Sequence, residues 1–317
     1  MANSSITYSD LQAYRDYAEI ISPDFLSKAY FGNQTAGLVV GHDGVKGKKI
    51  LTQMILGELG RRYEKTFAPV ADLINFKPRT LEVNAGKFEF AFAPQDFEST
   101  YLADLKRTGF DNTNELPFQG FMMMKIAAKM AQEIEIAMWQ AKIPGTIANT
   151  DVLTQIIDGY LELVTVAIAA SDLTPTAVTG GAFTTSNIIP TIESMWDTLD
   201  AVYQDMPIKV FLAPHLWKLY NVAYRENYGK YTDNAQSGRM QLDFCNAELI
   251  RTPGMGASNR IVMTPLDNVH YGYDDVDIAS SLNFEKDHRE LHFWSDFKMG
   301  VQFGFLEDGI VAVNDLA

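Results

Sequence analysis

One 25-residue stretch, FQGFMMMKIAAKMAQEIEIAMWQAK from Phe118 to Lys142, constrains the fold more than any other part of this chain. It has no proline and its only glycine lies near its start, so a helix there would run uninterrupted for about 37 Å. One side of that helix carries polar residues: Lys125, Lys129, Gln132, Glu133 and Gln140. The other side carries apolar residues: Met123, Ile126, Met130, Ile134, Ala137, Met138 and Ala141. The pattern predicts a long amphipathic helix that packs one face on a sheet and shows the other to solvent or to a neighbouring molecule.

The rest of the chain has the composition of a folded globular protein. Of its 317 residues 47% are apolar and 21% are charged, enough for one large domain or two ordinary ones. The single cysteine, Cys245, excludes an intramolecular disulfide and a cysteine-held metal. The net charge of −14 argues against a general nucleic-acid-binding protein, but not against a container whose inner surface tolerates nucleic acid. We find neither a secretory signal at the start nor an apolar run long enough to cross a membrane.

Alternating residues predict strands before the long helix. The segment TLEVNAGKFEFAFAP, residues 80–94, alternates on both sides of Asn84-Ala85-Gly86-Lys87, where Gly86 can take a positive φ. We therefore expect a β-hairpin, which alone would be marginal in water and must lie on its own domain or on another chain. Helices are predicted on either side of it, at residues 9–21 and 95–109.

The second half of the chain mixes helices and strands. The apolar run IKVFLAP at residues 208–214 predicts a buried strand, followed by a helix over residues 215–229. A helix is expected over residues 187–204, and residues 151–173 are expected to begin helical and become extended from Leu161. One further strand is expected within residues 259–274, and two or three alternating strands within residues 289–314. The result is an α+β protein without internal repeats.

A search for catalytic chemistry finds no supported site. The Gly47-Lys48 pair fails as a phosphate-binding loop, because His42 stands in place of its first glycine and Lys49 in place of its hydroxyl residue. No GxSxG nucleophile motif occurs.

The metal-binding alternatives are equally weak. His288 and His292 are four residues apart, but Arg289 replaces the glutamate of the zinc-protease motif and the surrounding residues favour a strand. The YDDVD segment, residues 273–277, is expected to be a solvated turn, with a weak cation site as the alternative. We therefore assign no catalytic, cofactor-binding or metal-binding residue, and we expect no enzyme.

The order of these elements resembles the major capsid protein of tailed bacteriophages, a fold shared with encapsulin compartments. RTLEVNAGKFEFAFAP (residues 79–94) looks like the extended loop that reaches over a neighbouring subunit, and residues 118–142 look like the spine helix. The helix, strand and helix of residues 187–229 look like the axial domain. DFKMGVQFGFLEDGIVAVN (residues 296–314) looks like the closing strands.

The resemblance implies a division of the chain into five parts. These are an N-terminal arm (1–66), an extended loop with the β-hairpin and following helix (67–110), a peripheral domain with the spine helix (111–185), an axial domain (186–285) and return strands of the peripheral domain (286–317). Seven residues of the loop are candidate inter-subunit contacts: Arg79, Leu81, Val83, Lys87, Phe88, Phe90 and Phe92. On this reading the apolar face of the hairpin is buried by the next subunit.

The implied function is an icosahedral shell around double-stranded DNA, located in the virion and assembled in the host cytoplasm. Its partners would be other copies in hexamers and pentamers, a portal, separate scaffolding and decoration proteins, and non-specifically contacted DNA, with no membrane and no cofactor. Lys77 and Lys87 could serve a loop crosslink, but nothing in the sequence indicates that either reacts. The alternatives are an encapsulin-like compartment and a soluble enzyme with an unrecognised site.

Overall fold

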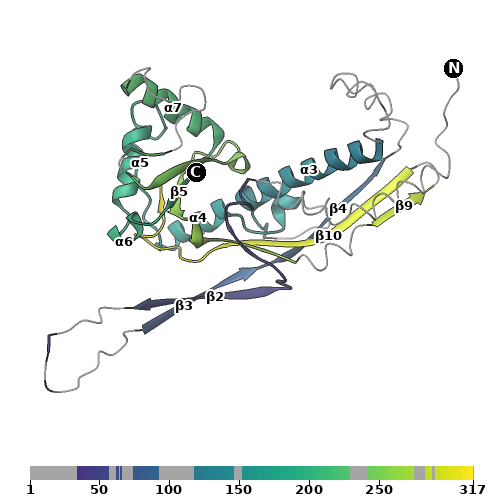
Figure 1. Cartoon of the computed structure of the whole chain (residues 1–317), viewed down its shortest axis with the longest axis horizontal. Helices are drawn as coiled ribbons and strands as arrows, with labels where there is room; N and C mark the ends of the chain where they lie inside the picture. Colours follow the sequence, from purple (N-terminus) through teal and green to yellow (C-terminus); the bar gives the residue numbers. More distant parts are fainter. Residues whose placement is uncertain are drawn as a thin grey trace.

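The computed structural model describes a two-part body from which a two-stranded ribbon projects (Figure 1). It describes residues 34–56, 62–63, 65, 74–92, 118–145, 152–228, 241–243, 245–274, 283–287 and 290–316. The helices expected at residues 9–21 and 95–109 lie outside these residues.

A five-stranded sheet forms the base of the first part. Its strands run in the order β1 (Val40–His42), β8 (Val269–Tyr273), β10 (Glu290–Phe303) and β4 (Asn84–Phe92), and β9 (Asn283–Asp287) also pairs with β10. The 14-residue β10 is the central strand: it pairs with β4 over residues 291–299 and with β8 over residues 299–303. Residues 289–314 therefore contain two strands, β10 and the short β11 (Ala312–Val313), where two or three were expected.

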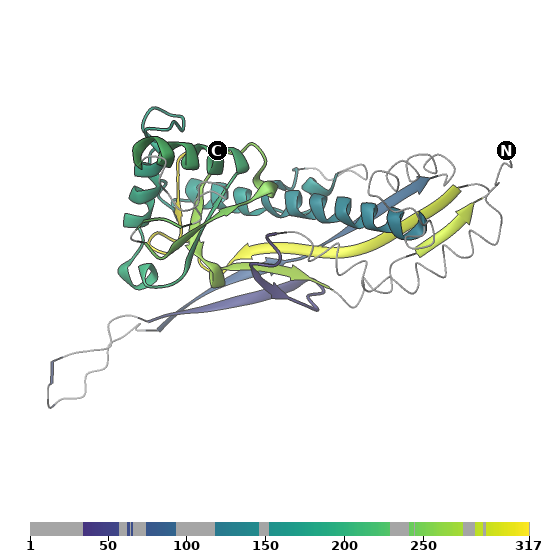
Figure 2. The ribbon, with the colours of Figure 1, turned by 45° about the horizontal axis from the view of Figure 1, so that its top comes forward.

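The long helix α3 (Phe118–Gln140) lies along this sheet, as Figures 1 and 2 show. The apolar side predicted from the sequence is buried from Met130 to Ala141, and the polar side is exposed. Lys129 and Glu133 form the expected pair one turn apart, with 3.3 Å between Nζ and Oε1. The prediction of an amphipathic helix is therefore confirmed. It ends two residues earlier than expected.

A second, four-stranded sheet carries the other part of the body. Its order is β11, β7 (Val262–Pro265), β5 (Ile208–Leu212) and β6 (Ala247–Arg251), with α5 (Ile188–Asp197) and α7 (Pro214–Tyr228) packed against it. The predicted strand β5 and the helix after it are thus confirmed. Ile208, Val210 and Leu212 face the α5–α7 core, whereas Phe211 enters the core beneath α3. Burial on both faces explains why four of the five residues of β5 are apolar, Lys209 being the exception.

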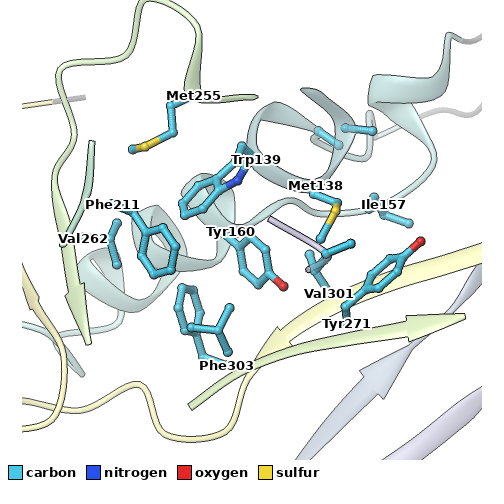
Figure 3. Packing of buried hydrophobic residues seen from close by; sticks show 14 of the residues in the cluster. Met138, Trp139, Ile157, Tyr160, Phe211, Met255, Val262, Tyr271, Val301 and Phe303 are labelled. Carbon is cyan, nitrogen blue, oxygen red and sulfur yellow. The ribbon is translucent and has the colours of Figure 1, made fainter. Parts of the chain in front are cut away.

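An aromatic cluster joins the two parts into one body (Figure 3). Trp139 of α3 lies 5.1 Å, ring to ring, from both Phe211 of β5 and Tyr160, the first residue of α4 (Tyr160–Ala169). Tyr160 in turn meets Phe303 of β10 edge-on, at 5.2 Å. All four side chains are fully buried, so the two sheets cannot separate without exposing this cluster.

The predicted hairpin at residues 80–94 is wrong. The two strands there follow each other with only Val83 between them, and they belong to different sheets: β3 (Ile74–Glu82) pairs with β2 (Lys48–Leu56), and β4 pairs with β10. Gly86 is not among the described glycines with positive φ. It is small for another reason: a Cβ there would lie 2.6 Å from the ring of Phe297.

Three other expectations are also corrected. Residues 160–169 are helical, not extended from Leu161, because the buried Tyr160, Val164 and Ala167 recur with the helical period. The helix expected over residues 187–204 is divided into α5 and the single-turn α6 (Ala201–Gln204). Residues 259–274 contain two strands, β7 and β8, because the chain turns at the short 3₁₀ helix of residues 266–268 and enters the other sheet.

Candidate functional site

The most conspicuous surface is the ribbon formed by β2 and β3, which runs away from the body in both views (Figures 1 and 2). Its register places Ile50 opposite Thr80 and Thr52 opposite Pro78, so these residues and Phe76 share one face. Ile50 is 64% exposed and Phe76 is 58% exposed. Large apolar side chains exposed on an isolated two-stranded ribbon indicate a surface that another molecule covers.

The opposite face of the ribbon is basic and is tied to the body. Lys77 donates to Glu307 at 2.7 Å. Arg79 lies half-buried in a groove shared with Asp172 and Glu307. Burial lowers the pKa of Arg79, while the two carboxylates oppose that shift. These contacts fix the direction in which the ribbon leaves the body, and Phe76, which also lines the groove, stays largely exposed.

Two facing glycines let the ribbon cross the large sheet where it joins the body. We call this end of the ribbon, residues 47–49 and 81–83, its root. Gly272 of β8 and Gly300 of β10 are direct partners. A Cβ on Gly300 would overlap the carbonyl of Glu82, and one on Gly272 would lie 2.9 Å from the side chain of Leu81. Val83, at the crossing, donates its N–H to the carbonyl of Gly47 at 2.8 Å. The crossing therefore depends on two positions without a side chain: Gly300 admits the backbone of Glu82, and Gly272 admits the side chains of Leu81 and Val83.

The structure places four of the seven predicted contacts against other parts of their own chain. Leu81 and Val83 are buried within their own chain and offer no surface to a partner. Phe88 stacks on Phe297 at 4.8 Å and Phe90 on Phe293 at 4.5 Å, both against the main core. Phe88 and Phe90 thus lie beside their β10 neighbours on the face of the sheet that packs into the main core, and both keep part of their surface exposed.

The remaining predicted contacts stay predictions. Arg79 lines the groove described above, and Lys87 is exposed and pairs with Glu89 at 2.7 Å. Phe92 pairs with Leu291 through its backbone, and its side chain lies outside what the structure describes. Ile50 and Phe76 were missed. Their alternating neighbours are a usable signal, but the predicted arm includes Ile50, and Phe76 stands outside the predicted hairpin.

A hydrogen-bonded chain of three side chains stands beside the ribbon root. Lys49 Nζ lies 2.9 Å from His42 Nδ1, and His42 Nε2 lies 3.1 Å from His270 Nδ1. A charged lysine can only donate, so His42 accepts at Nδ1, carries its proton on Nε2 and donates that proton to His270. The chain requires both imidazoles to be neutral. It links β2, β1 and β8, which are separate strands at the base of the ribbon.

Acidification is expected to break this chain. Burial first, and then the neighbouring His42 and Lys49, lower the pKa of His270 from 6.5 to about 4, while Asp267 opposes the shift. Burial and Lys49 also lower the pKa of His42. A histidine with a depressed folded-state pKa stabilises the fold above its unfolded pKa, and that stability is lost as the pH falls from 6.5 towards 4. We expect thermal unfolding midpoints of the wild type to fall faster over this range than those of His270→Gln. Equal slopes would contradict this role.

A buried carboxylate ties the start of the described chain to α3. Glu135 accepts hydrogen bonds from the Thr35 N–H at 3.0 Å and from the Thr35 hydroxyl at 2.5 Å. The Trp139 indole N–H donates to the same hydroxyl at 2.8 Å. Burial raises the pKa of Glu135, and its hydrogen bonds from Thr35 and Gly254 oppose that rise. The sequence predicted no role for Glu135, because a charged residue is not expected among buried ones.

The described residues offer little for catalysis. They contain no group of three or more His, Cys, Asp or Glu side chains placed to hold a metal ion. Burial raises the pKa of Cys245, the opposite of an activated thiol. His288 lies outside the described residues, so the pairing of His288 with His292 stays untested. Among the helices described, none is long and apolar enough to cross a membrane.

Comparisons with known proteins find relatives only at the level of structure. No family model matches the chain, and no curated protein matches it. A structure described as a satellite phage P4 procapsid including size determination (Sid) protein matches with a TM-score of 0.57 and 12% identity, over 91% of this chain and 89% of that one. A Gordonia phage Cozz structure matches with a TM-score of 0.56 and 11% identity, over 89% and 86%.

A third match is the capsid of a native GTA particle, with a TM-score of 0.53 and 13% identity over 91% of this chain and 90% of that one. At such identities the likeness concerns the fold alone, but in each of these three pairs it spans nearly the whole of both chains. The chain therefore has the major capsid protein fold of tailed bacteriophages, as its order of elements had indicated.

Proposed function

We propose that this chain is the subunit of an icosahedral shell that encloses the double-stranded DNA of a tailed bacteriophage. The observation that carries the proposal is the projecting ribbon. Its outward apolar face, with Ile50 and Phe76, has no cover among the described residues of its own chain. In a fold shared with phage procapsid and capsid particles, such a face is expected to lie on a neighbouring subunit.

In the shell, copies of this chain are arranged by symmetry in hexamers and pentamers. Specific protein interfaces commonly bury about 1,600 Å² in total, and many modest contacts closed by symmetry make a stable shell. Portal, scaffolding and decoration proteins remain expected partners, with assembly in the host cytoplasm. The net charge of −14 supports only non-specific contact with the packaged DNA.

Within this proposal, the predicted division of the chain changes at one place. The loop that reaches the neighbour begins at β2, inside the segment 1–66 that we had assigned to the arm. Residues 118–140 serve as the spine helix, and the four-stranded sheet with α5 and α7 serves as the axial domain.

Sedimentation of the purified protein, with electron microscopy of the fastest fraction, tests the proposal. Closed shells tens of nanometres across are expected, and DNA in shells from infected cells would identify a virus capsid. One co-purifying cargo protein would instead identify a compartment. A monomer or small oligomer that never assembles, even with a co-expressed scaffold, would contradict the proposal and return attention to a soluble enzyme.

The Phe76→Asp variant tests the role of the ribbon face. Because Phe76 is 58% exposed, we expect the free energy of unfolding to change by no more than about 0.5 kcal/mol. We expect shell formation to be lost, since a carboxylate would be buried against the neighbour. Val166→Asp is the matched control: Val166 is similarly exposed, on α4. Normal shell yield from Phe76→Asp, measured by sedimentation, would remove the ribbon face from the interface.

A further inference from the structure

Charge is distributed very unevenly along this acidic chain. Residues 46–82, which include the ribbon, contain eight lysines and arginines and four acidic residues. Residues 143–208 contain eight acidic residues and no lysine or arginine. A positive projection and a base-free acidic region on one molecule are electrostatically complementary between two copies.

The far end of the ribbon exposes residue types that dominate protein interfaces. Arg62, Tyr63 and Lys65 lie in the connection between β2 and β3 and are exposed, Tyr63 by 85%. Tyrosine and arginine are enriched among interface residues that contribute most to binding. Figures 1 and 2 show that β2 and β3 run away from the body.

The acidic region exposes a matching surface around α6. Val202 of α6 and Met206, two residues after the end of α6, are exposed apolar side chains. The exposed carboxylates of Asp197, Asp200 and Asp205 surround them in sequence. Within the described part of the chain, none of these carboxylates has a lysine or arginine partner. An aromatic ring flanked by cations fits an apolar pair flanked by carboxylates.

We propose that the basic end of the ribbon docks on the α6 surface of a second copy of this chain. This inference rests on the proposed shell function and names the partner surface within it. Tyr63 covers the apolar pair, and Arg62 and Lys65 meet the carboxylates beside it. DNA would attract the cations alone, but it offers no counterpart to Tyr63 and leaves Val202 and Met206 uncovered.

Charge reversal on each side tests this docking. Variant one is Arg62→Glu with Lys65→Glu, and variant two is Asp197→Lys with Asp205→Lys. All four side chains are exposed, and lysine at the ends of α5 and α6 suits the helix dipole, so both variants should fold. We expect each variant to lose at least about tenfold in shell yield, because like charges meet at the contact. The control for variant one, Lys218→Glu with Arg225→Glu on α7, makes the same charge change as that variant elsewhere and should assemble normally.

Combination of the variants separates contact between molecules from contact within one. A one-to-one mixture of variants one and two restores opposite charges only between different chains, so assembly should recover. The chain carrying all four substitutions should also recover. Recovery of that chain without recovery of the mixture would overturn the proposal in favour of an intramolecular contact.

Two further outcomes keep this proposal distinct from the shell function. Normal shells from variant one that retain less DNA would assign the basic end to DNA and overturn the docking while the shell function stands. The Debye length falls from about 10 to 3 Å between 0.1 and 1 M NaCl. A shell yield of the wild type that rises over this range would also overturn the docking. Failure of the wild type itself to form shells would refute the shell function first.

Discussion

Gly300→Ala should be among the most damaging single-methyl changes in this chain, costing about 3 kcal/mol in the free energy of unfolding. The added Cβ would overlap the carbonyl of Glu82, a backbone atom that no side-chain rotation can move. The strand β3 would have to lift from β8 and β10, which would release the buried Leu81 and Val83. We therefore expect the ribbon to lose its fixed direction and shell formation to fail together with stability.

Urea unfolding of Gly300→Ala and Gly47→Ala measures this effect. Gly47 belongs to the same root, accepts the hydrogen bond from Val83, and would bring its Cβ into open space without a positive φ. Gly47→Ala should thus stay within about 0.5 kcal/mol of the wild type. Equal stabilities for the two variants would show that the close crossing of β3 over β10 is not required.

Trp139→Ala is expected to cost about 3–5 kcal/mol, the largest effect of any side-chain truncation that we consider. Trp139 is fully buried and contacts Tyr160 and Phe211, so its loss opens a cavity where the two sheets meet (Figure 3). It also removes the donor to the Thr35 hydroxyl. Because the cluster holds both parts of the body together, unfolding of the two parts should become separable.

Trp139→Phe is the companion variant, since it keeps an aromatic ring and removes the indole N–H. It should cost about 1 kcal/mol for the lost hydrogen bond, beyond the smaller change in packing. Calorimetry of both variants gives the comparison, with one transition expected for Trp139→Phe and a broadened or divided transition for Trp139→Ala. A single sharp transition near the wild-type midpoint for Trp139→Ala would contradict the joining role of the cluster.

The elements that sequence predicts well here are those whose periodicity is local. The polar and apolar sides of residues 118–140 repeat over six turns, so α3 and its buried face follow from spacing alone. The strand β5 is recognisable because both of its faces are apolar, and the following Pro214 marks the first residue of α7. The order of these elements along the chain was enough to indicate the fold.

Strand pairing is not a local property, and there the sequence was misleading. The alternation over residues 80–92 correctly marks two strands, but nothing in it says that they pair with β2 and β10 instead of with each other. Gly86 resembles a turn residue only until Phe297, more than 200 residues later, is known to lie over it. The seven predicted contacts depend on the same non-local information. Phe88 and Phe90 share one apolar face, and only the structure shows that this face packs into the chain's own core beside Phe297 and Phe293.

The single residue between β3 and β4 has a mechanical consequence. Because Val83 alone separates them, residues 74–92 form one nearly continuous tether from the projecting ribbon into the body. A force along the ribbon reaches β4 parallel to its axis, where nine residue pairs join it to β10. Such a load shears all of these pairs at once, whereas a perpendicular load would peel them apart one after another. If the ribbon is bound to a neighbouring subunit, outward pressure on the shell would be resisted by all of the β4–β10 pairs together.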